Sequence, residues 1–232
     1  GNQYDNVVGL YPTRLFNPDF SWEANKKLEF ALDLGLFNDR VMLNAAHYRN
    51  RSSNQLVGIP LPATTGFSSI NANLDATVEN TGWELGLHTI NVRSDAFQWS
   101  TSLNLTFPKN KLVAFPDLEG STYANRYVIG EPLGITKVYQ LEQVDPETGL
   151  YEFTDFNGDG NISSVEDRQV LRDLSPKYFG GLTNSLVFRK FSVDVLFQFT
   201  KQLGYNLWER SSMPGRMFNQ PREALQRWQA IG

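Results

Sequence analysis

Hydrophobic and polar residues alternate along much of this chain. Between residues 97 and 107 nearly every second residue is apolar, and the residues between them are polar. The same period of two recurs over residues 28–36, 41–48, 83–92 and 191–199. Because successive side chains of a β-strand point to opposite faces, each stretch is expected to form a strand with one apolar and one polar face.

The connections between these stretches are of two kinds. Tight polar turns are expected at residues 38–39, 94–95 and 189–190, with a further strand over 182–188 before the last of them. Long connections are expected over residues 49–81 and 108–135. Strands of about 9 to 11 residues joined by alternating tight and long connections are typical of membrane β-barrels. A soluble β-sandwich, the alternative, usually has shorter strands and more even connections.

The two ends of the chain add little to this pattern. Ala224, Leu225 and Trp228 have helical spacing, so residues 221–231 are expected to form a short helix or an ordered loop. No apolar run reaches the roughly 18 to 20 residues of a transmembrane helix. No signal peptide is expected, because Asp5 and Pro12 interrupt the first apolar residues.

Composition excludes some functions without choosing a fold. Aromatic residues make up 13% of the chain, which suits membrane barrels, glycan-binding proteins and soluble sandwiches alike. The 21 basic and 25 acidic residues give a net charge of −4, so no nucleic-acid partner is expected. Cysteine is absent, which excludes disulfides, thiolate metal sites and cysteine nucleophiles.

Residues 155–166 match a single calcium-binding loop of the EF-hand or dockerin type. Such a loop presents oxygen ligands at positions 1, 3, 5, 7, 9 and 12 and turns sharply at a glycine in position 6, here Gly160. Ile162 at position 8 is expected to tuck into the neighbouring core. The predicted metal ligands are Asp155, Asn157, Asp159, Asn161, Ser163 and Glu166.

The flanks of this loop argue for a structural Ca²⁺ and against a signal sensor. Residues 151–154 look extended, and residues 164–171 are expected to form a short helix, which is not a helix–loop–helix pair. Asp167 follows Glu166, so either carboxylate could close the site. The alternative is a metal-free turn rich in Asp, Asn and Gly.

No catalytic residues are expected. His47 and His88 are the only histidines, and neither has a nucleophile elbow, a zinc-ligand spacing or a phosphate loop beside it. Glu142 and Asp145 could be read as a glycosidase pair, but their polar surroundings near Pro146 favour a solvated loop.

A calcium-stapled carbohydrate-binding module, in the form of a soluble β-sandwich, is the other open function. It would stack sugar rings on exposed tryptophans. The candidates are Trp83, Trp99, Trp208 and Trp228. Strand alternation places Trp83 and Trp99 on an apolar face, which favours contact with lipid or core over contact with sugar.

Several short segments follow one another in a distinctive order. They lie at residues 17–23, 34–40, 60–62, 65–67, 79–85, 129–134, 155–166 and 175–181. In this order they resemble the SusC-like TonB-dependent receptors, which are outer-membrane importers of the Bacteroidetes type. The resemblance spans nearly the whole chain.

The resemblance implies an all-β fold, an antiparallel up-and-down meander that forms part of a large outer-membrane β-barrel. Residues 1–232 would be one partial barrel domain, while the plug, the TonB-contacting segment and the final strands would lie outside it. It also implies import of an oligosaccharide, or sometimes a peptide, across the outer membrane of a Gram-negative bacterium. The implied partners are TonB, a SusD-like lipoprotein and outer-membrane lipid.

Overall fold

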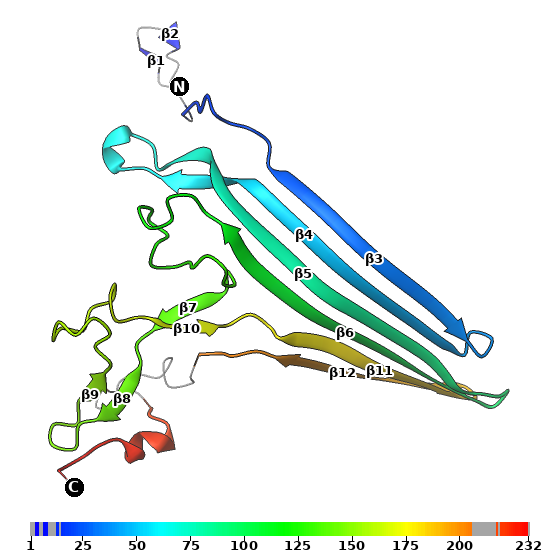
Figure 1. Cartoon of the computed structure of the whole chain (residues 1–232). Coiled ribbons are helices and arrows are strands. Elements are labelled where there is room, and N and C mark those ends of the chain that lie inside the picture. Colours follow the sequence, from blue (N-terminus) through cyan, green and yellow to red (C-terminus); the bar gives the residue numbers. More distant parts are fainter. Residues whose placement is uncertain are drawn as a thin grey trace.

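The six longest strands form one antiparallel sheet that follows the chain as a meander. A computed structural model describes residues 3–4, 7–8, 13, 15–205, 217 and 219–231. The order of strands in the sheet is β12-β11-β6-β5-β4-β3 (Figure 1). Their bounds are β3 Ala24–Leu36, β4 Val41–Pro60, β5 Ser69–Arg93, β6 Phe97–Ala114, β11 Tyr178–Phe188 and β12 Phe191–Lys201. The predicted all-β antiparallel meander is confirmed.

All three predicted tight turns lie at the same end of the sheet. Phe188 pairs with Phe191 across the turn at residues 189–190, and the turn at 37–40 joins β3 to β4. At the third turn the Ser94 backbone N–H donates to the Phe97 carbonyl oxygen at 2.9 Å. All the longer connections lie at the opposite end, which we call the long-loop end (Figure 1).

The predicted long connection over residues 49–81 is wrong. β4 and β5 stay paired far beyond the apolar stretches, as far as Pro60 opposite Ser69, so that only residues 61–68 connect them. The pattern missed this extension because residues 50–54 are polar on both faces, and the backbone ladder holds them without an apolar side. The connection predicted over 108–135 is likewise shorter, because β6 continues to Ala114.

Polar side chains tie the N-terminal segment to this extension of β4 and β5. Asn73 accepts a hydrogen bond from the Ser21 backbone N–H at 2.9 Å and donates its amide to the Ser21 carbonyl oxygen at 2.8 Å. The Asn54 amide donates to the Trp22 carbonyl oxygen at 2.9 Å. Asn54 has a φ of 58° and lies where the register of β4 against β5 shifts. The 17–23 segment therefore has a structural role.

The small buried core lies at the long-loop end and not along the sheet. Its members are Ala76, Val78, Leu112, Phe115 and Leu118, with Tyr123, Tyr127 and Leu133 packed against them. The 129–134 segment folds back onto β6: the Gly130 N–H donates to the Leu112 carbonyl oxygen at 2.8 Å. Gly130 has a φ of 93°, a conformation that glycine adopts without strain.

Shorter elements fill the rest of the long-loop end. Residues 115–177 carry two two-stranded sheets, one of β7 (Ile135–Val138) with β10 (Val170–Asp173) and one of β8 (Leu141–Val144) with β9 (Tyr151–Phe153). A third pairs β1 (Gln3–Tyr4) with β2 (Val7–Val8). The 3₁₀ turns among the described residues are η1 (Ala63–Thr65) and η3 (Arg222–Gln226), and η3 is the short helix expected within residues 221–231.

No helix among the described residues has both the length and the apolar character needed to cross a membrane. Within the same residues no second sheet packs on the apolar side of the six strands, and every residue of β3 and β12 is exposed. The soluble β-sandwich, which would bury that side against a second sheet, is therefore not the fold of the described chain.

Candidate functional site

The two faces of the six-stranded sheet have different chemistry. On one, which we call the apolar face, residues from neighbouring strands lie in register. One such row joins Leu32, Ala45, Leu85, Leu105 and Gly180. The opposite, polar face carries Asn44, His88, Ser102 and Thr183, again from neighbouring strands. A sheet with one continuous apolar face, which no layer of the described residues covers, is suited to contact with lipid.

Gly180 on the apolar face has no room for a side chain. A Cβ atom built there would clash with the Asn104 carbonyl oxygen and with the Phe199 ring. The Phe199 ring in turn lies 6.5 Å from that of Tyr178, which packs at 5.9 Å against Phe107. The 175–181 segment therefore contains the start of β11, and its glycine at position 180 leaves space for an aromatic ring to lie against the backbone.

Aromatic side chains gather near both ends of the apolar face. One row, which we call the upper aromatic row, joins Phe30, His47, Trp83 and Phe107. Near the tight turns Phe97, Phe188 and Phe191 lie opposite one another. From Phe97 to Phe107 the strand advances about 34 Å, or about 26 Å in height at a barrel tilt of about 40°. A transmembrane barrel has an apolar band about 25 Å tall with an aromatic girdle at each border, and the height spanned here matches that band.

Two of the four tryptophans proposed for sugar binding belong to this apolar face. Trp83 is 53% exposed, and the centroid of its ring lies 4.8 Å from the centroid of the His47 ring. Trp99 donates its indole N–H to Asn184 at 3.0 Å. Their predicted placement on the apolar side is confirmed. Trp228 binds the Pro146 carbonyl oxygen instead, and Trp208 lies outside the described residues.

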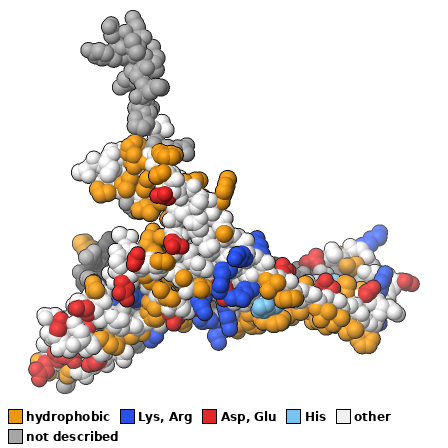
Figure 2. Space-filling model, turned by 45° about the horizontal axis from the view of Figure 1, so that its top comes forward, with side chains coloured by type: hydrophobic (Ala, Val, Ile, Leu, Met, Phe, Trp, Pro, Cys, Tyr) orange, Lys and Arg blue, Asp and Glu red, His pale blue; other side chains and the backbone are white. Residues whose placement is uncertain are grey.

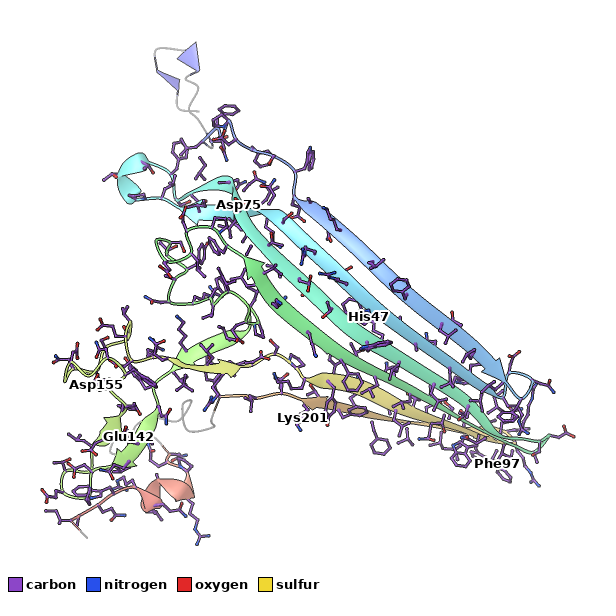
Figure 3. The ribbon with its side chains drawn as sticks, viewed as in Figure 1. His47, Asp75, Phe97, Glu142, Asp155 and Lys201 are labelled. Carbon is purple, nitrogen blue, oxygen red and sulfur yellow. The ribbon has the colours of Figure 1, made fainter. Side chains whose placement is uncertain are left out.

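The calcium-type loop is held by its own carboxylates. Asp155 accepts backbone N–H groups from Gly158 and Gly160, both at 2.7 Å, and Asp159 accepts the Asn161 N–H at 2.7 Å. The Gly160 N–H, with help from its neighbours, lowers the pKa of Asp155 below its ordinary value. These bonds stabilise the loop above the ordinary pKa of an aspartate and are lost as pH falls through the lowered value. Figure 3 shows Asp155 in the small-sheet region, away from the six-stranded sheet.

Asp167, and not Glu166, is the carboxylate turned into the loop. Asp167 is fully buried and accepts the Phe156 N–H at 2.8 Å and the Ser163 N–H at 2.7 Å. Glu166 is exposed, and among the described residues its carboxylate accepts the Ser163 hydroxyl alone, at 3.3 Å. The sequence left these two residues open as the closing carboxylate, since spacing alone does not say which one faces inward.

The helix predicted over residues 164–171 is wrong. Ser163 does act as a cap, because its hydroxyl oxygen accepts the Glu166 N–H at 3.0 Å. Only one turn follows at residues 164–166, and the chain then enters strand β10 at Val170. Both carboxylate oxygens of Asp167 accept backbone N–H groups of the loop, which ties the chain to the loop at the point where the turn ends.

The loop offers the right atoms for a hard cation. Asp155, Asn157, Asp159, Ser163 and Asp167 present side-chain oxygens, and oxygen is the ligand atom that Ca²⁺ takes. Each carboxylate oxygen that accepts one N–H keeps a second lone pair. Among the described residues, however, no three acidic or histidine side chains already converge closely enough to mark a metal site. Calcium binding by the predicted ligand set therefore remains a prediction.

The two histidines considered for catalysis lie on the six-stranded sheet, whereas the two carboxylates lie in and directly after β8. His47 packs at a tilt against Trp83 on the apolar face, whereas His88 shares a hydrogen bond of 2.9 Å with Ser102 on the polar face. Glu142 accepts the Thr154 hydroxyl at 3.0 Å, and Figure 3 shows it near the small sheets. The Thr148 hydroxyl lowers the pKa of Asp145, which also accepts the Glu147 N–H within a turn. These carboxylates serve local turns and strand ends.

Known proteins with similar sequence are receptors. TonB-dependent receptor P26 of Formosa agariphila is 33% identical over 249 residues, which cover 95% of this chain and 25% of that protein. TonB-dependent receptor P3 of the same organism is 30% identical, covering 89% of this chain and 23% of its own length. The chain thus spans about a quarter of the length of these relatives.

Two solved structures share the fold at lower identity. The RagAB peptide transporter aligns with a TM-score of 0.65 and 21% identity, over 85% of this chain and 23% of its own. The RagAB peptide importer in its open-open state aligns with a TM-score of 0.65 and 22% identity, over 86% and 23%. Neither the relatives nor these structures are named as enzymes.

A family model places the chain directly. The model described as TonB dependent receptor-like, beta-barrel matches residues 1–161, which include β3 to β6 and most of the calcium-type loop. An apolar face with the height of a transmembrane band and named receptor relatives agree with that match. The chain therefore belongs to the TonB-dependent receptor β-barrel family, as a part of a barrel of the SusC-like type in the outer membrane of Gram-negative bacteria.

Proposed function

We propose that this chain forms part of the barrel wall of an importer that takes up an oligosaccharide, with a SusD-like lipoprotein and TonB as partners. The observation that carries the proposal is the sheet's division into an apolar and a polar face. In a barrel the apolar face meets lipid and the polar face, with Asn44, His88 and Ser102, lines the passage. The tight turns then lie on the periplasmic side and the long-loop end on the extracellular side.

A peptide is the second candidate for the imported molecule. The structural relatives that support it are titled a peptide transporter and a peptide importer. The extracellular extension of β4 and β5 and the small sheets above the membrane are the parts of this chain that a ligand would meet first. They present hydrogen-bonding groups such as Asn71 and Gln143, which suit either ligand class.

Deletion of the intact receptor gene tests this function. Cells lacking the receptor are expected to lose uptake of one fluorescently labelled ligand class, oligosaccharide or peptide, and to regain it when the gene is restored. Removal of TonB is expected to abolish uptake while surface binding persists, since TonB supplies energy and not affinity. Uptake of both classes that is unchanged in the deletion strain would contradict the proposal.

We also propose a structural Ca²⁺ in the 155–167 loop, held by Asp155, Asn157, Asp159, Asn161 and Ser163, with Asp167 in place of Glu166 as the closing carboxylate. A chelator is expected to lower the melting temperature of the detergent-solubilised receptor by about 2–4 °C, because a ligand that binds only the folded state stabilises it. Asp159→Ala should remove this sensitivity, because it deletes a ligand oxygen.

Glu147→Ala is the matched control for the calcium prediction. Glu147 is an exposed loop carboxylate of the same small-sheet region that is not among the predicted ligands. This variant should keep the full response to chelator. A wild-type receptor whose melting curve is unchanged by chelator would disprove the calcium site.

A further inference from the structure

Basic side chains form two rows on the apolar side of the sheet, directly above the upper aromatic row. The first row contains Arg49 and Lys109, and the second contains Lys26, Arg51 and Lys111 together with Glu79. We call these five basic residues and Glu79 the outer basic cluster. Blue side chains gather in the middle of the space-filling view, between orange surfaces and beside a histidine (Figure 2).

Glu79 holds the two arginines together. Its Oε2 accepts Nε of Arg49 at 2.9 Å and Nη2 of Arg51 at 2.9 Å. These bonds, that from Arg49 foremost, lower the pKa of Glu79. The Glu79 side chain is 14% exposed, whereas those of Arg49 and Arg51 are 50% and 42% exposed. The carboxylate is therefore covered by guanidinium groups that themselves face outward.

The positive charge of the cluster is not balanced. Lys26, Lys109 and Lys111 are exposed and form no ion pair within the described part of the chain. One carboxylate thus stands against five cations, although the chain as a whole carries a net charge of −4. A surplus of this kind attracts anions at the surface where it lies.

The positive charge is concentrated on the outward side, where five of the six basic residues at this height lie. On the polar face, the intervening row at the same height contains Lys27, Asn50, Asn80 and Asn110. The Asn110 amide donates to Asn80 at 2.6 Å, so the middle of this row is a neutral amide pair. A merely solvated strand extension would have no reason to place its cations on one side, whereas a surface that meets membrane lipid would.

The height of the outer basic cluster above the apolar band indicates which ligand it meets. Successive rows on one face lie two residues apart, about 7 Å along a strand and about 5 Å in height at barrel tilt. On each strand, the basic residues therefore lie about 5–10 Å above the residue of the upper aromatic row on the same strand. The headgroup layer on each side of a bilayer is about 5–8 Å thick, so the cluster lies where lipid phosphates lie.

We propose that the outer basic cluster binds the phosphate groups of an anionic glycolipid headgroup in the outer leaflet. The guanidinium fork of Arg matches phosphate oxygens, and the three lysines add mobile point charges on both sides of the Arg49–Glu79–Arg51 centre. The proposal rests on the barrel orientation alone and holds whether the receptor imports a sugar or a peptide.

Retention of lipid A by the purified intact receptor tests this site. Binding of lipid A and of its dephosphorylated form is measured in detergent by native mass spectrometry, for wild type, Lys26→Gln, Lys27→Gln and the triple variant Lys26→Gln/Lys109→Gln/Lys111→Gln. Each cation near an anionic lipid contributes about fivefold in affinity. Lys26→Gln should weaken binding about fivefold and the triple variant about a hundredfold, while Lys27→Gln, one residue away on the polar face, changes nothing.

Several results would overturn the proposal. These are equal affinity of wild type for phosphorylated and dephosphorylated lipid, equal loss in Lys26→Gln and Lys27→Gln, and a triple variant that binds as wild type does. Full displacement of lipid A by millimolar inorganic phosphate would also overturn it, because the site would then recognise the free anion and not the lipid. None of the three lysines makes an ion pair within the described residues, so the variants are expected to fold, which melting in detergent verifies.

Discussion

Leu103→Lys is expected to cost about 2–4 kcal/mol of folding free energy when the receptor inserts into lipid vesicles. Leu103 lies on the apolar face of β6, between Leu87 of β5 and Leu182 of β11. It is near the middle of the span from Phe97 to Phe107, where a lipid-facing lysine must carry its charge into hydrocarbon. A loss of this size lowers the equilibrium ratio of folded to unfolded receptor roughly 30- to 1000-fold. Urea titration in vesicles, followed by tryptophan fluorescence, measures it.

Ser102→Lys is the matched control for that substitution. Ser102 is the preceding residue, at the same depth, and its hydroxyl bonds to His88 on the polar face. Replacing it removes one exposed hydrogen bond, which costs about 0.5–1.5 kcal/mol, and leaves the new ammonium in water. Equal losses for both variants would mean that the apolar face does not meet lipid, and the assignment of the two faces would fall.

The membrane-spanning part of the fold could be predicted from the sequence because lipid imposes a period of two on it. Phe97, Trp99, Leu103, Leu105 and Phe107 all lie on one face, as their alternation indicates. Outside the membrane this constraint ends. In the β4 and β5 extension, residues 50–54 are polar on both faces, so the period of two is lost there and the strands were taken for a long connection.

The residues of the calcium-type loop could be named from the sequence, but their arrangement could not. Spacing identified the loop, yet Glu166 and Asp167 are adjacent carboxylates, and only packing showed that Asp167 is the buried one. The outer basic cluster was missed entirely. The sequence did contain a signal for it. Arg49 and Arg51, like Lys109 and Lys111, are two residues apart, so basic residues continue the alternation of the strand beyond its last apolar residues. The register that brings these pairs side by side comes only from the sheet.

The isolated chain of 232 residues is expected to associate in plain buffer and to become monodisperse in detergent. Phe30, Phe191 and Phe197 on its apolar face are 67%, 76% and 59% exposed. Soluble monomers rarely expose contiguous apolar patches beyond a few hundred Å². β3 and β12 also leave one edge unpaired each within the described sheet, and open edges template pairing with other strands. Sedimentation velocity with and without detergent measures the outcome, and a monodisperse monomer without detergent would contradict it.

The apolar face, more than the open edges, should drive this association. Pairing two edges exchanges hydrogen bonds with water for hydrogen bonds between chains, a net gain of only about 0.5–1.5 kcal/mol each. Burying apolar side chains gains about 25 cal/mol per Å², and the face extends over all six strands. Detergent covers the apolar face but leaves the backbone edges free, so it distinguishes association through the face from association through the edges.

A triple variant of β12, Val193→Ser/Val195→Ser/Phe197→Ser, makes the outward residues of this strand polar without closing its edge. It should reduce association in buffer. If association instead persists in detergent and in this variant, the edges and not the face hold the chains together.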